Sequence, residues 1–393
     1  MVKKISILTA TRAEYGLLKP IIEKLNQEKY FNVKVVATGM HLSPEFGSTY
    51  HEIEKDGIIM DEKIEILLSS DTPVSISKSM GLAMISFAEY FDRIKPDLLI
   101  VLGDRYETLA VCCAAMNARI PIAHLYGGET TEGAVDESIR HAITKMSYLH
   151  FTSTETYRQR VIQLGEDPKR VFTVGAMGIE NILSTKLLSK TELEKTLSFN
   201  LNQPYAVITF HPVTLEANNV KQQFETLLKA CDAHPEMHYI FTKANSDAYG
   251  RVINRMIDDY AANHSNVCAF ESLGMLRYLS ALKYARYVMG NSSSGLVEVP
   301  GFKIPTINIG DRQKGRIQSE TVINCEPDFE YILNAMDKAE DKDFREQIKT
   351  SKNPYGDGVT SGKIINVIKD FLENDRICLK KQFYDLGVEG GSL

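Results

Sequence analysis

The sequence of 393 residues lacks the basic excess that proteins use to bind nucleic acids. Its net charge is −6 and its pI is about 5.9, which argues against a nucleic-acid partner or an anionic membrane surface. No stretch approaches the roughly twenty apolar residues of a membrane span. The N-terminal apolar run ends at Leu8, and it is shorter than the roughly seven to fifteen residues of a secretory signal. We therefore expect a cytoplasmic protein without a membrane partner.

Common cofactor motifs are also missing. Neither GxGxxG after the first predicted strand nor GxxxxGK[ST] occurs, which disfavours nicotinamide dinucleotides and ATP-type phosphate loops. The cysteines show no CxxC spacing and no Cys/His spacing typical of a metal site, and several lie in apolar runs. We expect reduced core thiols. The six are Cys112, Cys113, Cys231, Cys268, Cys325 and Cys378.

What the chain does contain is an alternation of short β-branched runs and amphipathic stretches. Near-continuous apolar strands separated by helices indicate parallel sheets covered on both faces. The amphipathic stretches include 15–27, 77–94, 138–147 and 221–234. The predicted strands are 4–10, 33–39, 97–103, 120–126, 149–153, 170–175, 205–210, 237–243, 266–270, 285–290 and 304–310.

The strands and helices fall into two series, which predict two doubly wound α/β domains. We place the first domain at 1–175 and the second at 176–360. The remainder, 361–393, begins with a helix-like run that we expect to pack back onto the first domain. Ligands of such sheets bind at the carboxyl ends of the strands.

Polar side chains follow nearly every predicted strand at that end. Each has an ordinary alternative explanation: Asp104 and Asp136 would suit helix N-caps, worth about 1 kcal/mol each. Asp136 and Arg140 are spaced for a surface ion pair, and His211 would suit a hydrogen-bonded strand end. We treat their concentration as the signal. In chain order they include Arg12, Glu14, Asp104, Arg105, Glu107, Glu129, Asp136, Glu137, His211, Asn245, Ser292, Ser293, Ser294, Arg312 and Arg316.

The stretch GNSSSGLVEV, 290–299, predicts a phosphate site. Three serines at a helix start would offer hydroxyls, free backbone N–H groups and the positive end of the helix. Glu298, one turn further on, would accept both hydroxyls of a ribose. Arg12 and Arg312, from different domains, would neutralise a diphosphate. The combination predicts a nucleoside diphosphate in the cleft.

At these residues the sequence resembles the hydrolysing UDP-N-acetylglucosamine 2-epimerases of sialic acid and related nonulosonic acid biosynthesis. The resemblance implies a GT-B-like fold, with two Rossmann-like domains and the UDP-sugar between them. It also implies no metal, no redox cofactor and a homodimer or homotetramer. The matching stretches are TATRAEYGLLKP, ATGMHLSPEFGSTYHEIEKDG, VLGDRYE, HLYGGETTEGAVDESIRHAITKMSYLHFTSTETYRQRVIQLGE, FHPVT, GNSSSGLVEV and INIGDRQKGR.

The implied reaction eliminates UDP from the sugar to give a 2-acetamidoglucal, and water addition then releases N-acetylmannosamine. Asp104, Glu129 and Asp136 match the family's catalytic carboxylates. Arg140 matches an arginine that orients them, and His211 matches a catalytic histidine at the leaving phosphate. The residues expected to bind the UDP-sugar are Arg12, Arg105, His211, Asn245, Ser292, Ser293, Ser294, Glu298 and Arg312.

One position departs from the pattern. Tyr126 stands where the animal and non-hydrolysing relatives carry an acid, and a phenol with a pKa of about 10 is a poor base at neutral pH. Glu129 is then our preferred proton-transfer residue, beside Asp104 and Asp136. The departure would also suit a sugar altered at C4, such as UDP-N,N′-diacetylbacillosamine. Two other hypotheses are a glycosyltransferase on the same fold and an inactive UDP-sugar sensor.

Overall fold

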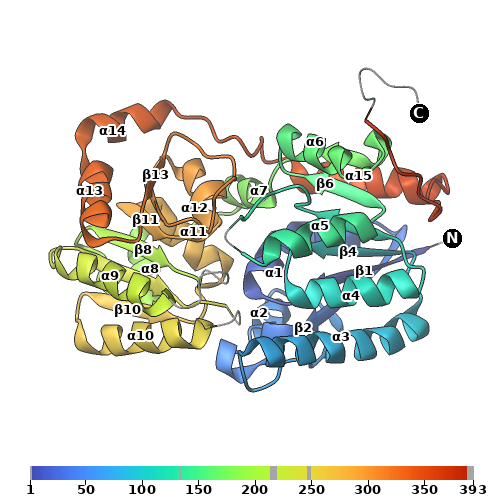
Figure 1. Cartoon of the computed structure of the whole chain (residues 1–393), viewed down its shortest axis with the longest axis horizontal. Coiled ribbons are helices and arrows are strands. Elements are labelled where there is room, and N and C mark those ends of the chain that lie inside the picture. Colours follow the sequence, from blue (N-terminus) through green and yellow to red (C-terminus); the bar gives the residue numbers. More distant parts are fainter. Residues whose placement is uncertain (1, 133, 213–218, 246–248, 387–393) are drawn as a thin grey trace.

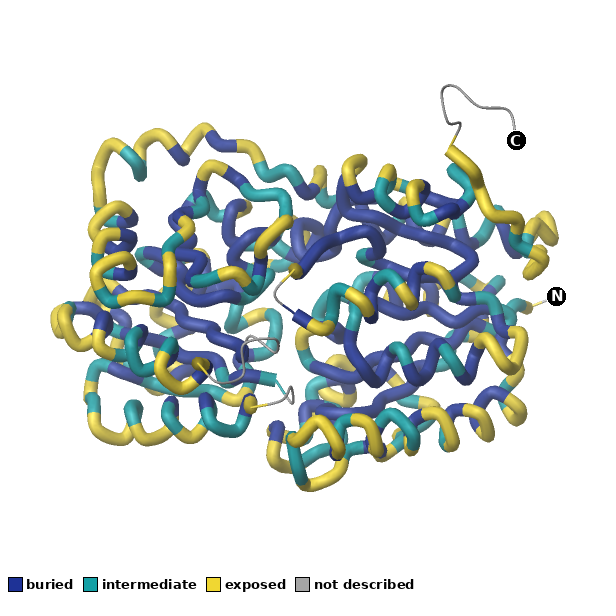
Figure 2. The backbone as a smooth tube through the Cα atoms, in the orientation of Figure 1, coloured by how far each residue is buried: buried dark blue, intermediate teal, exposed yellow. Residues whose placement is uncertain are grey.

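The structure is a computed structural model that describes residues 2–132, 134–212, 219–245 and 249–386. It contains two parallel β-sheets, each covered by helices, which lie side by side (Figure 1). Figure 2 shows that the strands form the buried interior and the outer helix faces are exposed. Parts of the FHPVT motif and the last seven residues of the predicted C-terminal segment lie outside the described residues.

The first sheet has seven parallel strands in the order β3-β2-β1-β4-β5-β6-β7. The helices of this part are α1 (Arg12–Gln27), α2 (Tyr50–Lys55), α3 (Pro73–Ile94), α4 (Tyr106–Asn117), α5 (Asp136–Met146) and α6 (Glu155–Gln163). The strands are β1 (Lys3–Thr9), β2 (Phe31–Thr38), β3 (Met60–Ile64), β4 (Leu98–Leu102), β5 (Ile122–Leu125), β6 (Leu149–Thr152) and β7 (Val171–Thr173).

The second sheet has six parallel strands in the order β10-β9-β8-β11-β12-β13. The strands are β8 (Tyr205–Thr209), β9 (His238–Thr242), β10 (Val267–Phe270), β11 (Tyr287–Gly290), β12 (Thr306–Ile309) and β13 (Val322–Cys325). The helices are α8 (Lys190–Leu197), α9 (Val220–Asp232), α10 (Gly250–Asn263), α11 (Gly274–Tyr284), α12 (Ser294–Val297), α13 (Phe329–Glu340) and α14 (Lys342–Gln347).

Helix α1 shows how local sequence places a strand end at the cleft. Thr11 caps the helix: its hydroxyl accepts from the backbone N–H of Glu14 at 3.3 Å. The Glu14 carboxylate accepts from the N–H groups of Ala10 and Thr11 at 2.8 and 3.3 Å. This capping box ends β1 and starts α1 within two residues. Arg12 is thereby held at the carboxyl end of the sheet.

Two elements connect the sheets. Helix α7 (Met177–Ser184) follows β7, and α15 (Thr360–Glu373) returns from the second sheet to pack on α1. Ile364, Ile368 and Phe371 are buried in the same core as Ile5 and Ile7 of β1. Helix α15 therefore packs against the core of the first sheet. The residues at which one domain gives way to the next remain a prediction.

The predicted strands all occur, within one or two residues at most ends. The predictions missed β3 and β13, which are edge strands of their sheets. The cysteines are unpaired, but the expectation of core thiols is only partly right, because Cys378 is exposed. Among the described residues, no helix combines the length and the apolar character needed to cross a membrane.

Candidate active site

The predicted site residues lie together in the cleft between the two sheets. They line two adjoining cavities, and every one of them contacts at least one cavity. We call them the acid cavity, toward the first sheet, and the serine cavity, toward the second. His211, Asn245, Ser292, Ser293 and Glu298 line both. Asp104, Arg105, Glu129, Asp136, Arg140 and Arg312 line the acid cavity alone, and Arg12 and Ser294 line the serine cavity alone.

The serine loop follows β11 and leads into α12. This helix is short, because it spans only four residues before a 3-10 turn at Val299–Phe302. Pro300 explains the early end, since its ring cannot continue the hydrogen-bond pattern of an α-helix. The serines and Glu298 are nevertheless one helical turn apart, because the backbone N–H of Glu298 donates to the carbonyl of Ser294 at 2.9 Å. Glu298 therefore stands one turn beyond the serines, as expected.

Glu298 is half-buried beside the serine loop. Burial raises its pKa to about 7, and the nearby Glu129 carboxylate adds to the shift. Helix α7 passes so close that a Cβ on Gly178 would lie 2.2 Å from the Glu298 Oε1 atom. The absence of a side chain at Gly178 thus leaves room for this carboxyl.

His211 is fixed by a residue that the sequence analysis did not select. The Asn291 side chain accepts from the backbone N–H of His211 at 2.7 Å and donates to its carbonyl at 2.8 Å. The Asn291 carbonyl accepts in turn from Arg312 at 3.1 Å and from Gln313 at 2.8 Å. Asn291 therefore joins the ends of β8, β11 and β12.

On the first-domain side, Arg140 organises the acids. Its side chain is 1% exposed. One of its terminal nitrogens, Nη2, donates to the Asp104 carboxylate and, at 2.9 Å, to the Thr131 hydroxyl. The other, Nη1, donates to Glu137 at 3.1 Å and to the Glu129 carbonyl at 3.0 Å. Burial, with the Arg316 guanidinium nearby, lowers the pKa of Arg140. Arg140 therefore contacts the Asp104 carboxylate directly and ties it to the loop that carries Glu129 and Thr131.

Asp104 and Asp136 are not the helix caps that the alternative explanation required. Helix α4 begins after Arg105, and α5 begins at Asp136 itself, with neither N-cap residue making a side-chain cap. Both acids line the acid cavity. They are therefore placed for contact with a ligand.

Arg105 has an internal role in addition to lining the acid cavity. Its Nε atom donates to Glu107 at 2.6 Å and lies 4.0 Å from Glu14. Burial, with the Glu107 carboxylate nearby, raises the pKa of Glu14 to about 7. Glu14 also lines the acid cavity, although the sequence analysis did not name it as a site residue.

The Glu129 carboxylate is paired across the cleft. One oxygen lies 2.7 Å from the Arg316 guanidinium of the second domain, and the other accepts from the Ser153 hydroxyl at 2.8 Å. Arg12 of the first domain makes a second contact across the cleft: it donates a hydrogen bond to the Lys243 carbonyl of the second domain at 3.1 Å. Burial lowers the pKa of Arg12 to about 10, so it stays charged at neutral pH. Both domains therefore contribute charge to one ligand space.

Tyr126 is half-buried and lines the acid cavity. Its hydroxyl accepts from the backbone N–H of Met177 at 2.8 Å, and burial raises its pKa well above the ordinary value. It therefore stays protonated at neutral pH. This agrees with the expectation that Tyr126 cannot replace the acid of other relatives as a base.

Sequence reasoning named Glu14 and Arg316 at strand ends but gave them no role in the site, and it did not select Asn291. Arg316 and Asn291 do follow strands, in INIGDRQKGR and GNSSSG, so their positions carried a signal. Their partners, Glu129 and His211, lie far away along the chain, so the contacts themselves could not be predicted from the sequence. Within the described residues, no three His, Cys, Asp or Glu side chains gather in a metal-binding group.

Comparison with known proteins identifies the family of the chain. A family model described as UDP-N-acetylglucosamine 2-epimerase matches residues 23–369. The chain belongs to this family. It is 45% identical over 385 residues to the GDP/UDP-N,N′-diacetylbacillosamine 2-epimerase (hydrolyzing) of Campylobacter jejuni, covering 98% of this chain and 99% of that protein. It is 38% identical to the polysialic acid biosynthesis protein P7 of Escherichia coli, covering 98% of each.

Solved structures of the family share the fold. The UDP-GlcNAc 2-epimerase from Neisseria meningitidis bound to UDP-GlcNAc matches with a TM-score of 0.78 at 19% identity, covering 93% of this chain and all of that chain. The 2-epimerase therefore has the GT-B-like arrangement that the sequence predicted. The family match makes it a UDP-sugar 2-epimerase and gives no support to the glycosyltransferase alternative.

Proposed function

We propose that this 2-epimerase is hydrolysing and releases the free 2-epimeric sugar and UDP. The observation that carries the proposal is the pairing of an acid-lined first-domain wall with a serine and arginine wall in the second domain. The identity to the hydrolysing relative from Campylobacter jejuni adds support. UDP would lie along the serine cavity, with the ribose at Glu298 and the diphosphate near Arg12 and Arg312.

The chemistry requires removal of the C2 proton while the bond from C1 to the UDP oxygen breaks, and the bonding pair leaves with UDP. Water then adds to the 2-acetamidoglucal, its hydroxyl at C1 and a proton at C2 on the opposite face. Asp104 and Asp136 are the acids we assign to proton transfer. His211, beside the serine loop, would stabilise the departing phosphate. Arg140 would hold Asp104 in the orientation that transfer needs.

Two sugars are candidates, UDP-N-acetylglucosamine and UDP-N,N′-diacetylbacillosamine. Two observations favour the second. The relative from Campylobacter jejuni carries that sugar in its name. The half-buried, hydrogen-bonded Tyr126 lines the acid cavity, at the position where the resemblance implies an acid in other relatives. The relative from Escherichia coli, named for polysialic acid biosynthesis, keeps the first sugar in consideration.

Turnover of both UDP-sugars in D2O tests the proposal. We expect free 2-epimeric sugar carrying one deuterium at C2, together with UDP, and faster turnover of the diacetylated substrate. Asp136→Asn should abolish turnover while UDP still binds. A UDP-linked epimer as the product would make the enzyme non-hydrolysing, and an unlabelled product would exclude elimination and readdition.

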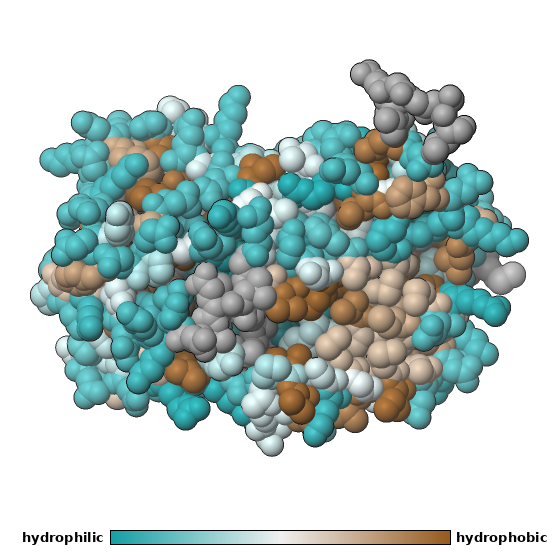
Figure 3. Space-filling model, in the orientation of Figure 1, coloured by the Kyte–Doolittle hydropathy of each residue, from teal (hydrophilic) through white to brown (hydrophobic). Residues whose placement is uncertain are grey.

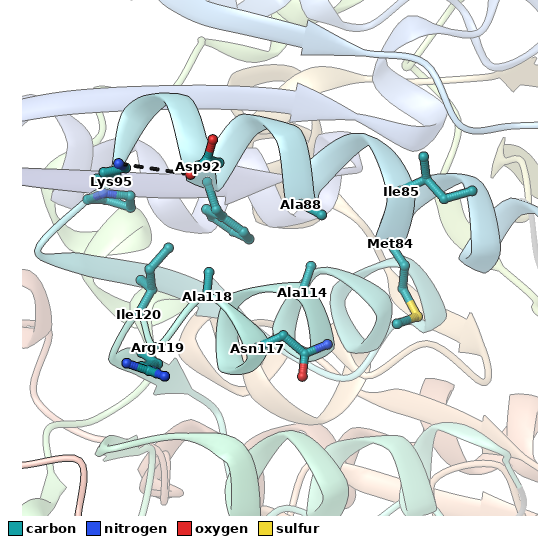
Figure 4. A pocket seen from close by; sticks show the side chains of 12 residues that line it. Met84, Ile85, Ala88, Asp92, Lys95, Ala114, Asn117, Ala118, Arg119 and Ile120 are labelled. Atoms are coloured by element: carbon teal, nitrogen blue, oxygen red, sulfur yellow. Dashed lines mark ion pairs between the residues drawn. The ribbon is translucent and has the colours of Figure 1, made fainter.

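We also propose that two copies associate through α3. Figure 3 shows apolar side chains gathered over α3 and α4. Leu82 and Ile85 are 40% and 65% exposed there. Between the two helices lies a groove with an apolar floor and a charged end at Asp92, Lys95 and Arg119 (Figure 4). Large exposed apolar patches of this kind are typical of protein interfaces.

The charges on α3 fit a second copy of the same helix. Lys78 precedes the exposed apolar pair and Glu89 follows it. Lys78 with Glu89, and Leu82 with Ile85, share one midpoint between Ala83 and Met84. An antiparallel contact about a two-fold axis would therefore place unlike charges opposite each other and apolar groups opposite each other.

A further inference from the structure

We propose that Arg316 is a positioning residue, which reaches from the second domain to hold Glu129 and thereby fixes the first-domain loop that orients Asp104. The inference rests on the proposed function. It assigns a role to a residue that the sequence analysis did not place in the site. It also changes the role of Glu129 from proton transfer to positioning.

The ion pair is buried and fully engaged on the carboxylate side. The side chains of Arg316 and Glu129 are 7% and 4% exposed, and their charged atoms lie 2.7 Å apart. The other Glu129 oxygen accepts from Ser153 at 2.8 Å. Each oxygen of Glu129 therefore already has a donor, whereas a general base needs an oxygen directed at the substrate proton.

Backbone contacts strengthen the crossing. The Nε atom of Arg316 donates to the Thr130 carbonyl at 3.0 Å. The next residue, Ile317, donates its N–H to the Tyr157 hydroxyl at 2.9 Å. A Cβ on Gly315, whose φ is +83°, would lie 2.8 Å from the Thr130 hydroxyl. The loop 313–317 is therefore packed directly on the loop 129–132.

The same first-domain loop holds the guanidinium that orients Asp104. Arg140 donates to the Glu129 carbonyl at 3.0 Å and to the Thr131 hydroxyl at 2.9 Å, and it also contacts the Asp104 carboxylate. A continuous set of contacts thus runs from Arg316 through residues 129–131 and Arg140 to Asp104. The acid can take its position only while the second domain holds this loop.

Arginine suits the position because it makes two contacts at once. Its planar group bonds the Glu129 carboxylate through Nη1 and the Thr130 carbonyl through Nε. A lysine would keep the charge but could not reproduce this fork. Arg316→Lys should therefore restore part of what Arg316→Gln loses.

The experiment measures kcat and KM with the UDP-sugar that the wild type turns over, and the Kd of UDP by calorimetry. We expect Arg316→Gln to lower kcat about 100-fold, the effect of a misplacement of roughly 1 Å, without changing the Kd of UDP. The kcat of Arg316→Lys should lie between that of Arg316→Gln and that of the wild type. The Glu129→Gln, Arg316→Gln double variant should be no slower than either single variant, because the two residues act as a unit.

Arg312→Gln is the matched control, since Arg312 lies on the same loop but donates to the Asn291 carbonyl. It should weaken UDP binding instead. A wild-type kcat in Arg316→Gln would overturn the inference. The inference would also be overturned if Arg316→Gln lost as much UDP affinity as it lost kcat/KM. The same holds if the kcat effects of the two single variants multiply in the double variant.

A second readout needs no turnover and separates this inference from the proposed function. Amide hydrogen exchange at residues 129–132 should be faster in folded Arg316→Gln than in the wild type. Unchanged exchange there would refute the positioning role. If the wild type is inactive but exchange at residues 129–132 is still faster in Arg316→Gln, the proposed reaction is refuted and the positioning role stands.

Discussion

Buried carboxyl groups distinguish this site from an ordinary strand-end cluster. Glu298 and Glu14 lie on opposite walls of the cleft, and burial raises the pKa of each to about 7. In an acid whose pKa is raised, the folded protein binds more protons than the unfolded chain between the ordinary pKa and the raised one. The contribution of such a group to stability therefore falls as pH rises through that window.

Glu298→Gln should remove one such contribution. The ordinary pKa of this group is 4.5 and the raised value is about 7. Between pH 5 and pH 8 the nucleotide-free wild type should therefore lose about 3 kcal/mol more unfolding free energy than the variant does. Urea denaturation at several pH values measures the difference.

Glu320→Gln is the control, because Glu320 is exposed. It should keep the pH dependence of the wild type. Parallel curves for the wild type and Glu298→Gln would show that Glu298 ionises normally in the folded protein. Glu14 is present in all three proteins, so its own contribution cancels from the comparison.

At the residue scale, sequence was a good guide to which side chains face the cleft and a poor guide to what they contact. Polar residues at the carboxyl ends of parallel strands must share an edge of the sheet, so Asp104 and Ser292 could be placed in advance. The partners of Glu129 and His211 could not. Arg316 and Asn291 reach them only through the packing of distant segments.

At the scale of elements, the position of α15 is important because this helix completes the core of the first domain. It follows the second sheet in sequence but packs on α1, where Ile368 is fully buried against the core around Ile5 and Ile7. Its apolar face is thus part of the first-domain core. The first sheet depends on a helix that comes from the other end of the chain.

Ile368→Ala should destabilise the protein by about 2 to 5 kcal/mol, the range for removing a large aliphatic side chain from a core. Chemical denaturation followed by circular dichroism measures the change. Asn366→Ala, at an exposed position of the same helix, should change stability by less than about 0.5 kcal/mol. Equal effects of the two substitutions would contradict the packing of α15 on the first sheet.

The elements that sequence failed to predict share a physical cause. Strand β3 reads MDEKI and strand β13 reads VINC, and each lies at the edge of its sheet. An edge strand has one neighbour and a solvent-facing side, so its residues need not be apolar throughout. A search for near-continuous apolar runs therefore finds central strands and misses these two. The sequence predicted where α12 begins, but no end was predicted for it, and the helix stops before Pro300.

At the scale of the whole molecule, the α3 face is the feature that a single chain leaves unexplained. Ile85→Asp would place a charge at the centre of the proposed contact between copies. It should convert the proposed dimer or tetramer of the wild type to a smaller species in analytical ultracentrifugation. Ile59→Asp, at a residue that is 81% exposed and lies outside α3, should leave the assembly unchanged. A monomeric wild type at micromolar concentration would exclude the interface.

The chain passes between the two sheets twice, and the two passages touch. The backbone N–H of Ala176 donates to the Tyr355 carbonyl at 2.7 Å, and a Cβ on Gly356 would lie 3.0 Å from the Cα atom of Gly175. Because the two connecting segments contact each other at this point, the two domains cannot rotate independently of this junction. We expect product release by rotation of the domains about this junction, which would widen the gap most at the opposite rim, where Arg251 and Glu45 form an ion pair at 2.6 Å.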